Sequence, residues 1–256
     1  AGRFQAVFTA GALIPKPVAT TRYYHRLLNT RKLLEVEFAR LLPGMTPEEM
    51  EDWLSVGPPP IVLPQGKSRP KPNEGDLTCY YRPMIRDDIP TVHRLLHRSA
   101  KARRLSPLFT KEEIEHHLLP RENLVWTYVA IPKSKKTKPK ITGFISFYSL
   151  PSTILNTPKS SPREGSTVRS AYCFYAASAT QGDGNPSPGE LLETAVRFAK
   201  AEGFDVLNSL EILESAPEVL EKAKFVRGDV DLYWYLYNWQ MKNASLTGTD
   251  IGIIPL

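Results

Sequence analysis

The stretch Thr9–Arg26, Thr-Ala-Gly-Ala-Leu-Ile-Pro-Lys-Pro-Val-Ala-Thr-Thr-Arg-Tyr-Tyr-His-Arg, joins two apolar, strand-like runs at the start of this chain. The first run is Gln5–Thr9 and the second is Leu33–Phe38. Proline lacks a backbone N–H and restricts the residue before it, so Pro15 and Pro17 exclude a helix in the first part of the connection. No general folding rule demands such a string, and it is the most informative stretch of the chain.

Capping boxes mark the start of two helices further along the chain. Thr46 followed by Glu49, and Thr110 followed by Glu113, have the spacing at which a threonine hydroxyl and a glutamate carboxylate cap the first helical turn. We therefore expect a short amphipathic helix that ends near Leu54 and a second helix after Thr110.

Two longer helices are predicted from the spacing of apolar residues. The first spans Ile89–Ala100, with Asp87 or Asp88 as its cap. The second begins after Ser187 and ends before Gly203, which stands where a left-handed residue stops a helix.

The remaining apolar runs are expected as strands. Leu124–Ile131 and Ile141–Leu150 flank the basic run Lys133–Lys140, which is typical of a solvated hairpin loop. The others are Leu77–Arg82, Val168–Ala177, Asp205–Ile212 and Leu232–Trp239, with a helix at Pro217–Lys224 between the last two. In this order, strands that follow one another directly come before strands that are connected by helices. Such an order favours a mixed sheet flanked by helices, and the fold class is then α/β or α+β.

Length, composition and charge limit the possible classes of protein. A chain of 256 residues, 41% of them hydrophobic, can bury one large core or two small ones. Residues 57–75 are rich in proline, glycine and lysine, so we interpret them as an extended surface connection. The net charge of +6 comes from basic residues interleaved with acidic ones, which disfavours a nucleic-acid-binding surface.

The cysteines and histidines form no recognisable metal motif. Cys79 and Cys173 are far apart in sequence, and a single pair favours reduced thiols in a cytoplasmic protein. His93 and His97 have a helical i, i+4 spacing but lack the glutamate of a zinc-protease motif. The sequence also lacks a run of about 18 apolar residues. We therefore expect no metal site and no transmembrane segment.

Three ordered stretches resemble the N-myristoyltransferases, enzymes that acylate the N-terminal glycine of other proteins. They are Thr9–Leu33, Phe147–Asn156 and Lys224–Trp239. The resemblance implies an acetyltransferase-like (GNAT-type) mixed twisted sheet, one half of a pseudo-twofold fold. It identifies residues 1–256 as the C-terminal, peptide-substrate-binding half. The chain starts without methionine in an apolar run, so we expect the acyl-CoA-binding N-terminal half to be missing and the isolated half to be inactive.

The resemblance also implies the chemistry. The amine of an N-terminal glycine attacks myristoyl-CoA, a co-substrate, without a prosthetic group, a metal or a covalent enzyme intermediate. The implied base is the C-terminal carboxylate, here that of Leu256, and the Thr9 hydroxyl lies near the amine and orients it. Burial would raise the pKa of such a carboxylate toward what a base needs. The oxyanion hole and the coenzyme A pocket belong to the other half.

Further positions match residues that line the peptide groove of the family. The Asp229 carboxylate would attract a basic residue of the substrate. Without the resemblance, the Tyr23–His25 stretch favours a surface loop, and Leu210 and Leu232 could equally be core residues. The matched positions are Tyr23, His25, Ser152, Tyr172, Asn208, Leu210, Gly228, Asp229 and Leu232.

One motif departs from the family pattern Lys-Phe-Gly-x-Gly-Asp-Gly. This chain keeps Gly228 and Asp229 but has Val226 and Val230 in place of two glycines. If either position needs a positive φ, the loop is strained or differently shaped. The divergent motif and the long loop insertions favour a fungal source.

A non-catalytic module that binds N-terminal peptides is the alternative function. An enzyme that uses its terminal carboxylate would be damaged by added C-terminal residues, whereas a binding module would tolerate them. We expect a monomeric full-length enzyme whose partners are N-terminal-glycine proteins. In the isolated half, strand edges left uncovered would reduce solubility.

Overall fold

The structure is a computed structural model that describes residues 5–60, 62–63, 77–133, 140–154, 167–179, 184–212, 215–241 and 246–255. The centre of the predicted lysine loop, most of the predicted connection at 57–75, and Leu256 lie outside the described residues.

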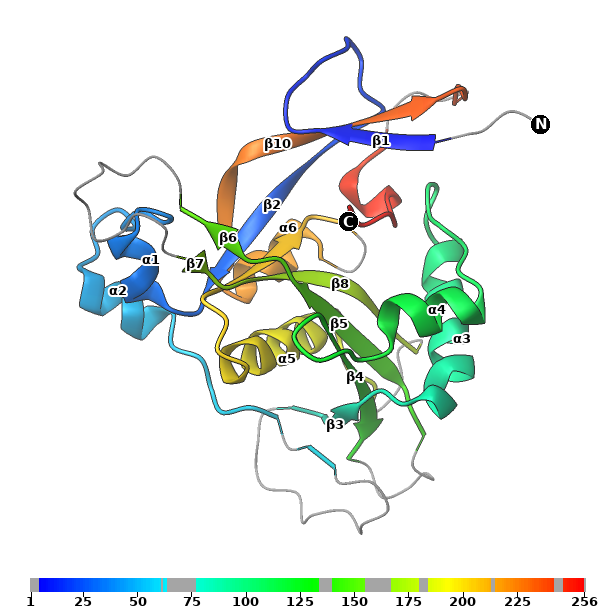
Figure 1. Ribbon diagram of the computed structural model, residues 1–256, viewed down its shortest axis with the longest axis horizontal. Coiled ribbons are helices and arrows are strands. Elements are labelled where there is room, and N and C mark those ends of the chain that lie inside the picture. Colours follow the sequence, from blue (N-terminus) through cyan, green and yellow to red (C-terminus); the bar gives the residue numbers. More distant parts are fainter. Residues whose placement is uncertain are drawn as a thin grey trace.

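An eight-stranded mixed sheet runs through the molecule in the order β1-β10-β2-β9-β8-β5-β4-β3 (Figure 1). Strands β8 and β9 pair in parallel, and the other neighbouring pairs are antiparallel. A separate two-stranded sheet pairs β6 with β7. The strands are β1 (Gln5–Thr9), β2 (Ala19–Leu27), β3 (Cys79–Pro83), β4 (Val125–Pro132), β5 (Gly143–Ser149), β6 (Ser152–Thr153), β7 (Thr167–Val168), β8 (Ser170–Ser178), β9 (Val206–Leu210) and β10 (Val226–Tyr237).

Helices cover both faces of the sheet. On one face, α3 and α4 pack against a cluster that includes Val129 and Phe144, and on the other α5 and α6 pack against a cluster that includes Tyr128 and Phe147. This division follows from the alternation of side chains along each strand. Helices α1 and α2 pack at the end of β2 around Leu27. The α-helices are α1 (Thr30–Glu35), α2 (Pro47–Trp53), α3 (Ile89–Lys101), α4 (Lys111–Leu118), α5 (Pro188–Ala201) and α6 (Pro217–Lys222), with 3-10 turns at Arg86–Asp88 and Gly248–Asp250.

The predicted helix starts and most predicted strands are confirmed. The Thr46 and Thr110 side chains accept hydrogen bonds from the backbone N–H groups of Glu49 and Glu113, and both capping boxes are complete. Gly203 has a φ of +77° immediately after α5, as expected for a left-handed stop. The predicted hairpin also forms, because β4 pairs antiparallel with β5.

Three local predictions were wrong. The run Leu33–Phe38 is not a strand, because Thr30–Glu35 forms helix α1, capped by the Asn29 side chain. Arg22–His25 is not a connection but the middle of β2, paired with β10 and β9. Asp88 precedes α3 without capping it, because its carboxylate accepts from the Ile85 N–H and pairs with Arg82.

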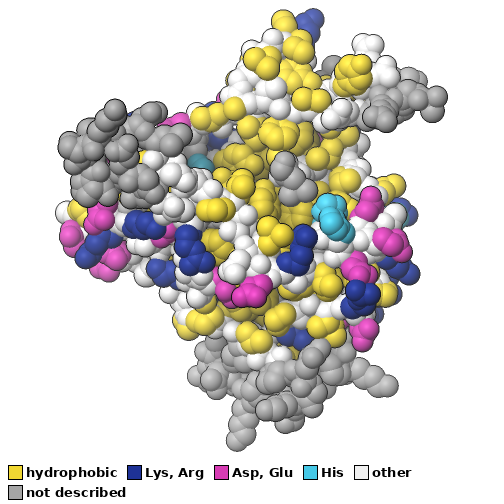
Figure 2. All heavy atoms as spheres, viewed as in Figure 1, with side chains coloured by type: hydrophobic (Ala, Val, Ile, Leu, Met, Phe, Trp, Pro, Cys, Tyr) yellow, Lys and Arg dark blue, Asp and Glu magenta, His cyan; other side chains and the backbone are white. Residues whose placement is uncertain are grey.

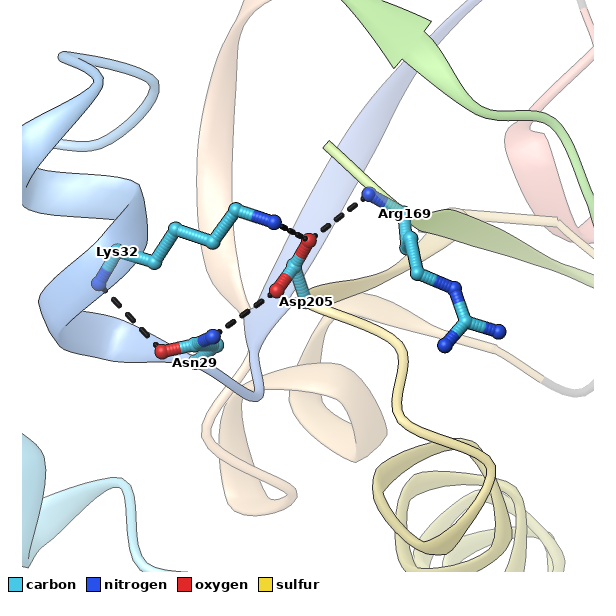
Figure 3. A network of polar contacts seen from close by, with 4 residues as sticks. All are labelled: Asn29, Lys32, Arg169 and Asp205. Carbon is cyan, nitrogen blue, oxygen red and sulfur yellow. Dashed lines mark hydrogen bonds and ion pairs between the residues drawn. The ribbon is translucent and has the colours of Figure 1, made fainter. Parts of the chain in front are cut away.

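A network centred on Asp205 joins α1 to the start of the parallel strand pair (Figure 3). The buried Asp205 carboxylate accepts hydrogen bonds from the Lys32 ammonium at 2.6 Å, the Asn29 amide at 3.0 Å and the Arg169 backbone N–H at 2.9 Å. Arg169 immediately precedes β8 and Asp205 immediately precedes β9. The network therefore holds the first residues of β8 and β9 together.

Hydrophobic side chains gather in a band over β1 and β10 and continue into the centre of the face shown in Figure 2. The exposed large hydrophobic residues on these strands and on the segment after β1 include Phe8, Leu13, Ile14 and Tyr237. Among the described strands β1 is the last of the sheet, so no described strand pairs with its outer edge. Reduced solubility of the isolated chain remains a prediction.

Candidate functional site

A cleft opens where β8 and β9 stop pairing. The two strands are hydrogen-bonded neighbours only from Ser170 to Tyr172 on β8 and from Val206 to Asn208 on β9. Both continue beyond these pairs, to Ser178 and Leu210. Parallel strands that diverge at their carboxyl ends leave a crevice, which is a common place for a binding site in α/β sheets.

Tyrosines form one wall of the cleft. The rings of Tyr148 and Tyr172 stack with centroids 5.6 Å apart, and Tyr23 meets Tyr172 edge-on at 5.8 Å. The first turns of α5 contribute Leu191 and Leu192 on the opposite side. The space inside it that a water-sized molecule can occupy is about 30 Å³. The cleft is therefore narrow in this structure, with room for only a few water-sized groups.

The tyrosine hydroxyls of the cleft stay protonated. Burial raises the pKa of Tyr23 to about 12, and it also raises the pKa of Tyr148 and of Tyr172. A buried phenolate would lose its hydration, which is why the neutral form is favoured. The cleft therefore offers neutral donors and acceptors of hydrogen bonds.

The chain's last described residues lie against this cleft. Ile254 lines it, and the Tyr148 hydroxyl donates to the Pro255 carbonyl at 3.1 Å. The Ile254 N–H donates to the Tyr175 hydroxyl at 3.4 Å. A hydroxyl group of the tyrosine wall thus contacts the residue that precedes Leu256.

A second hollow, here named the groove, lies beside the cleft along β2. His25 lines it, together with Glu37–Leu42, Met50 and the start of β10 at Val226–Val230. His25 and Tyr23 are two residues apart on one strand, so their side chains point to the same face. The groove therefore continues the line of the cleft.

His25 is held as a neutral imidazole. Its Nδ1 lies 2.7 Å from the Asn208 side-chain oxygen, and because an amide oxygen only accepts, Nδ1 carries the proton. Burial lowers the pKa of His25, against the smaller raising effects of Asn208 and of the Asp229 carboxylate. Nε2 is then free of a proton and can accept a hydrogen bond.

The backbone of β10 approaches His25 closely at Gly228. A Cβ at this position would lie 2.7 Å from His25 Nε2 and 2.8 Å from the Tyr23 carbonyl oxygen. A side chain at 228 would therefore displace the imidazole or the strand.

The structure brings together most of the predicted site residues. Tyr23, Tyr172 and Leu210 line the cleft. His25, Gly228 and Asp229 line the groove, and Asn208 holds His25.

The other predicted residues lie elsewhere. Leu232 is 5% exposed in the core, opposite Thr21. Ser152 is exposed on β6, and the Thr9 hydroxyl, on the edge strand β1, donates to the Gly11 carbonyl. Leu256 lies outside the described residues.

The valines of the divergent motif are not strained. Val226 and Val230 both belong to β10, and the irregularity of its pairing with β2 lies between Arg227 and Asp231. Among the non-glycine residues described, the positive φ in this part of the chain belongs to Lys224, just before the strand. The motif is therefore a strand with a bulge, not a glycine loop.

The sequence interpretation missed two tyrosines. Tyr148 and Tyr175 contact the C-terminal segment, but neither was among the predicted site residues. Tyr148 lies inside the stretch Phe147–Asn156 that carries the resemblance. Its contact with Pro255 spans more than a hundred residues of sequence, so no local pattern could have indicated it.

Among the described residues, His, Cys, Asp and Glu form no cluster of three or more that could hold a metal ion. Within the same part of the chain, no helix is both long enough and apolar enough to cross a membrane.

Comparisons with known proteins converge on one family. The model described as "Myristoyl-CoA:protein N-myristoyltransferase, C-terminal domain" matches residues 70–254. A probable glycylpeptide N-tetradecanoyltransferase of Caenorhabditis elegans is 37% identical over 254 residues, which cover 99% of this chain and 49% of that protein. A glycylpeptide N-tetradecanoyltransferase of Aspergillus fumigatus is 37% identical over 249 residues, which cover 93% of this chain and 46% of the relative.

A solved structure of Saccharomyces cerevisiae N-myristoyltransferase with bound myristoyl-CoA is similar in fold. It superimposes with a TM-score of 0.78 at 28% identity, covering 99% of this chain and 60% of that one. The chain thus spans about half the length of the curated relatives. Nematode and fungal relatives are equally identical to it, so a fungal source stays a prediction.

Proposed function

Because this chain belongs to the N-myristoyltransferase family, we propose that it is the peptide-binding half of an enzyme that transfers myristoyl from myristoyl-CoA to N-terminal glycine. The observation that carries the proposal is the cleft between β8 and β9, lined by tyrosines and contacted by the C-terminal segment. Partners would be N-terminal-glycine proteins, and the acyl-CoA would be held by the other half. A monomeric, cytoplasmic enzyme remains our expectation.

The reaction requires a base. The ammonium of an N-terminal glycine has a pKa near 8 and must lose a proton before its amine attacks the thioester carbonyl. The carbon–nitrogen bond then forms, and the positively charged nitrogen gives up its second proton. Collapse of the tetrahedral intermediate expels coenzyme A as its thiolate, which takes up a proton to become the thiol. We propose that the Leu256 carboxylate takes the amine proton.

The position of the C-terminal segment supports this role. Pro255 is buried, and its carbonyl accepts a hydrogen bond from a tyrosine that also lines the cleft. A carboxylate in apolar surroundings has a raised pKa, which strengthens it as a base. Orientation of the amine by Thr9 stays a prediction, because in this structure the Thr9 hydroxyl donates to the Gly11 carbonyl.

The groove would bind the residues that follow the glycine. Side chains two residues apart on a strand are separated by about 7 Å, which is also the spacing of alternate residues in an extended peptide. A substrate lying along Tyr23 and His25 would therefore bring a later residue to Asp229, whose exposed carboxylate attracts a basic side chain. Neutral His25 can accept a hydrogen bond from a hydroxyl or an amide N–H of the substrate.

The test is myristoyl transfer by this chain joined to the N-terminal half of the C. elegans relative. Transfer to a peptide that begins with glycine, but not to the same peptide beginning with proline, is expected. Binding of the glycine peptide without transfer, by a fusion that binds myristoyl-CoA, would favour the alternative of a non-catalytic module.

A second variant tests the base. One alanine added after Leu256 moves the terminal carboxylate away from its position. We expect turnover to fall by roughly a hundredfold or more while peptide affinity changes little. Unchanged turnover would exclude this carboxylate as the base.

A further inference from the structure

The C-terminal segment Leu246–Pro255 is fixed by backbone hydrogen bonds up to Gly252. The Leu246 N–H donates to the Val18 carbonyl at 2.8 Å, and the Leu105 N–H donates to the Asp250 carbonyl at 3.1 Å. The Gly252 N–H donates to the Leu105 carbonyl at 2.7 Å, which completes a short parallel bridge. In Figure 1 this red segment accordingly lies between the β1–β10 pair and the α3–α4 pair.

Past Gly252 the hydrogen bonds come from tyrosine side chains. The Ile254 N–H donates to the Tyr175 hydroxyl, and the Tyr148 hydroxyl donates to the Pro255 carbonyl. The two tyrosines come from different strands, β8 and β5. One accepts and the other donates, so the orientation of the segment is set as well as its position.

Both tyrosine rings pack against other aromatic rings. The Tyr148 ring stacks on Tyr172 and meets Phe174 edge-on at 5.4 Å. The Tyr175 ring meets Phe109 edge-on at 5.1 Å and packs on Phe174 at 4.7 Å. Aromatic contacts of this kind favour particular ring orientations. Burial also raises the pKa of both hydroxyls, that of Tyr175 to about 12, so they remain protonated at neutral pH.

We propose that Tyr148 and Tyr175 are positioning residues that hold Ile254 and Pro255 at the edge of the cleft. The inference rests on the proposed function, in which the carboxylate of the next residue in the chain takes the proton of the glycine amine. Tyr148 also lines the cleft, so the same ring borders the space for the substrate and holds the segment that carries the base. Neither tyrosine touches the reacting atoms in this proposal.

Amide hydrogen exchange tests the placement without any activity. In Tyr148→Phe and Tyr175→Phe, measured in this chain by residue-resolved NMR, the Ile254 amide should exchange at least about threefold faster. The Gly252 amide should keep its wild-type rate, because its partner is the Leu105 carbonyl. Equal Ile254 rates in wild type and both variants would overturn the proposal.

Tyr235→Phe is the matched control. The Tyr235 hydroxyl donates to the Ile14 carbonyl at 3.0 Å, a bond of the same kind as that of Tyr148 but on another part of the sheet. This variant should leave the Ile254 exchange rate unchanged. An equal rise in Tyr235→Phe would mean that the loss of any such bond loosens the segment, and the proposal would be wrong.

Transfer kinetics of the fused enzyme test the consequence. Tyr148→Phe should lower kcat by roughly ten- to a hundredfold, as expected for a misplaced catalytic group, with the peptide KM within about twofold of wild type. A rise in KM with unchanged kcat would make Tyr148 a peptide contact instead and overturn the positioning role. If the wild-type fusion transfers nothing, the proposed function fails, whereas the exchange experiment still decides the placement.

Discussion

The His25 imidazole donates from Nδ1 to the Asn208 side-chain oxygen over 2.7 Å, and its Nε2 lies 2.7 Å from where a Cβ on Gly228 would stand. The bond joins neighbouring strands β2 and β9 and fixes which nitrogen of the ring carries the proton. The floor of the groove is therefore a neutral acceptor whose orientation is set by a residue outside the groove lining.

The first prediction concerns stability against pH. Burial lowers the pKa of His25 in the folded protein below its unfolded value of about 6.5, so the unfolded state binds more protons as the pH falls. The contribution of His25 to stability is therefore full above about pH 6.5 and declines below it. His25→Gln should flatten part of the slope of unfolding free energy between about pH 6.5 and 5, measured by urea denaturation.

His116→Gln is the control for this experiment, because His116 is exposed. The dependence of unfolding free energy on pH should therefore stay closer to that of wild type in His116→Gln than in His25→Gln. The same slope in wild type and His25→Gln would show that His25 does not titrate differently on folding.

The second prediction concerns the close approach of β10 to β2. Gly228→Ala would place a methyl group 2.7 Å from His25 Nε2, so the strand or the ring must move. We expect a loss of about 1–3 kcal/mol in unfolding free energy and weaker binding of an N-terminal-glycine peptide. Gly11→Ala, where a Cβ would meet nothing within 4 Å, should change stability far less. Equal effects of the two variants would contradict the predicted clash.

The third prediction concerns the network in Figure 3. Asp205→Ala would remove the shared acceptor of the Lys32 ammonium, the Asn29 amide and the Arg169 N–H. Because all three hydrogen bonds are part-buried, we expect a loss of about 2–3 kcal/mol in unfolding free energy, measured by urea unfolding.

Glu51→Ala provides a matched comparison for Asp205→Ala, because it breaks the exposed pair of Arg31 with Glu51. Exposed ion pairs contribute little, so the loss here should stay below about 1 kcal/mol. Similar losses for the two variants would mean that Asp205 contributes no more than a surface charge.

The fourth prediction concerns substrate charge. Asp229→Asn should weaken binding of a glycine peptide with a lysine in its later residues by about two- to fivefold, because Asp229 is exposed. A peptide with norleucine in place of the lysine should bind both forms alike, as measured by calorimetry. Glu218→Gln, an exposed change on α6 at the other face of the sheet, should affect neither peptide. A loss that is equal for both peptides would rule out charge recognition by Asp229.

Local signals in the sequence predicted local structure well. The capping boxes at Thr46 and Thr110 and the stop at Gly203 each depend on residues within one or two helical turns, and each formed as expected. The run Leu33–Phe38 was misassigned because its apolar residues suit a strand, whereas Asn29 caps a helix that buries Leu33 completely. The decisive signal was the cap, one turn upstream of the run.

The site could be predicted only in pieces. The resemblance indicated Tyr23, His25 and Asp229, but the cleft depends on where two strands stop pairing, which no local pattern encodes. Similarly, the position of Pro255 depends on a hydrogen bond with Tyr148, a residue far away in the sequence. Long-range features of this kind follow from the topology of the sheet. Composition and periodicity do not predict that topology.

The depth of the cleft depends on how many residues of β8 and β9 pair with each other. The Asp205 network holds the starts of the two strands together, and three residue pairs follow before the strands separate. One more residue pair between β8 and β9 would make the cleft shallower, and one pair fewer would make it deeper. The identity of the lining side chains would not change. The opening of the cleft is therefore set by backbone hydrogen bonding between β8 and β9, whereas its chemistry is set by the tyrosine side chains. The cavity's size and its chemistry are separately adjustable.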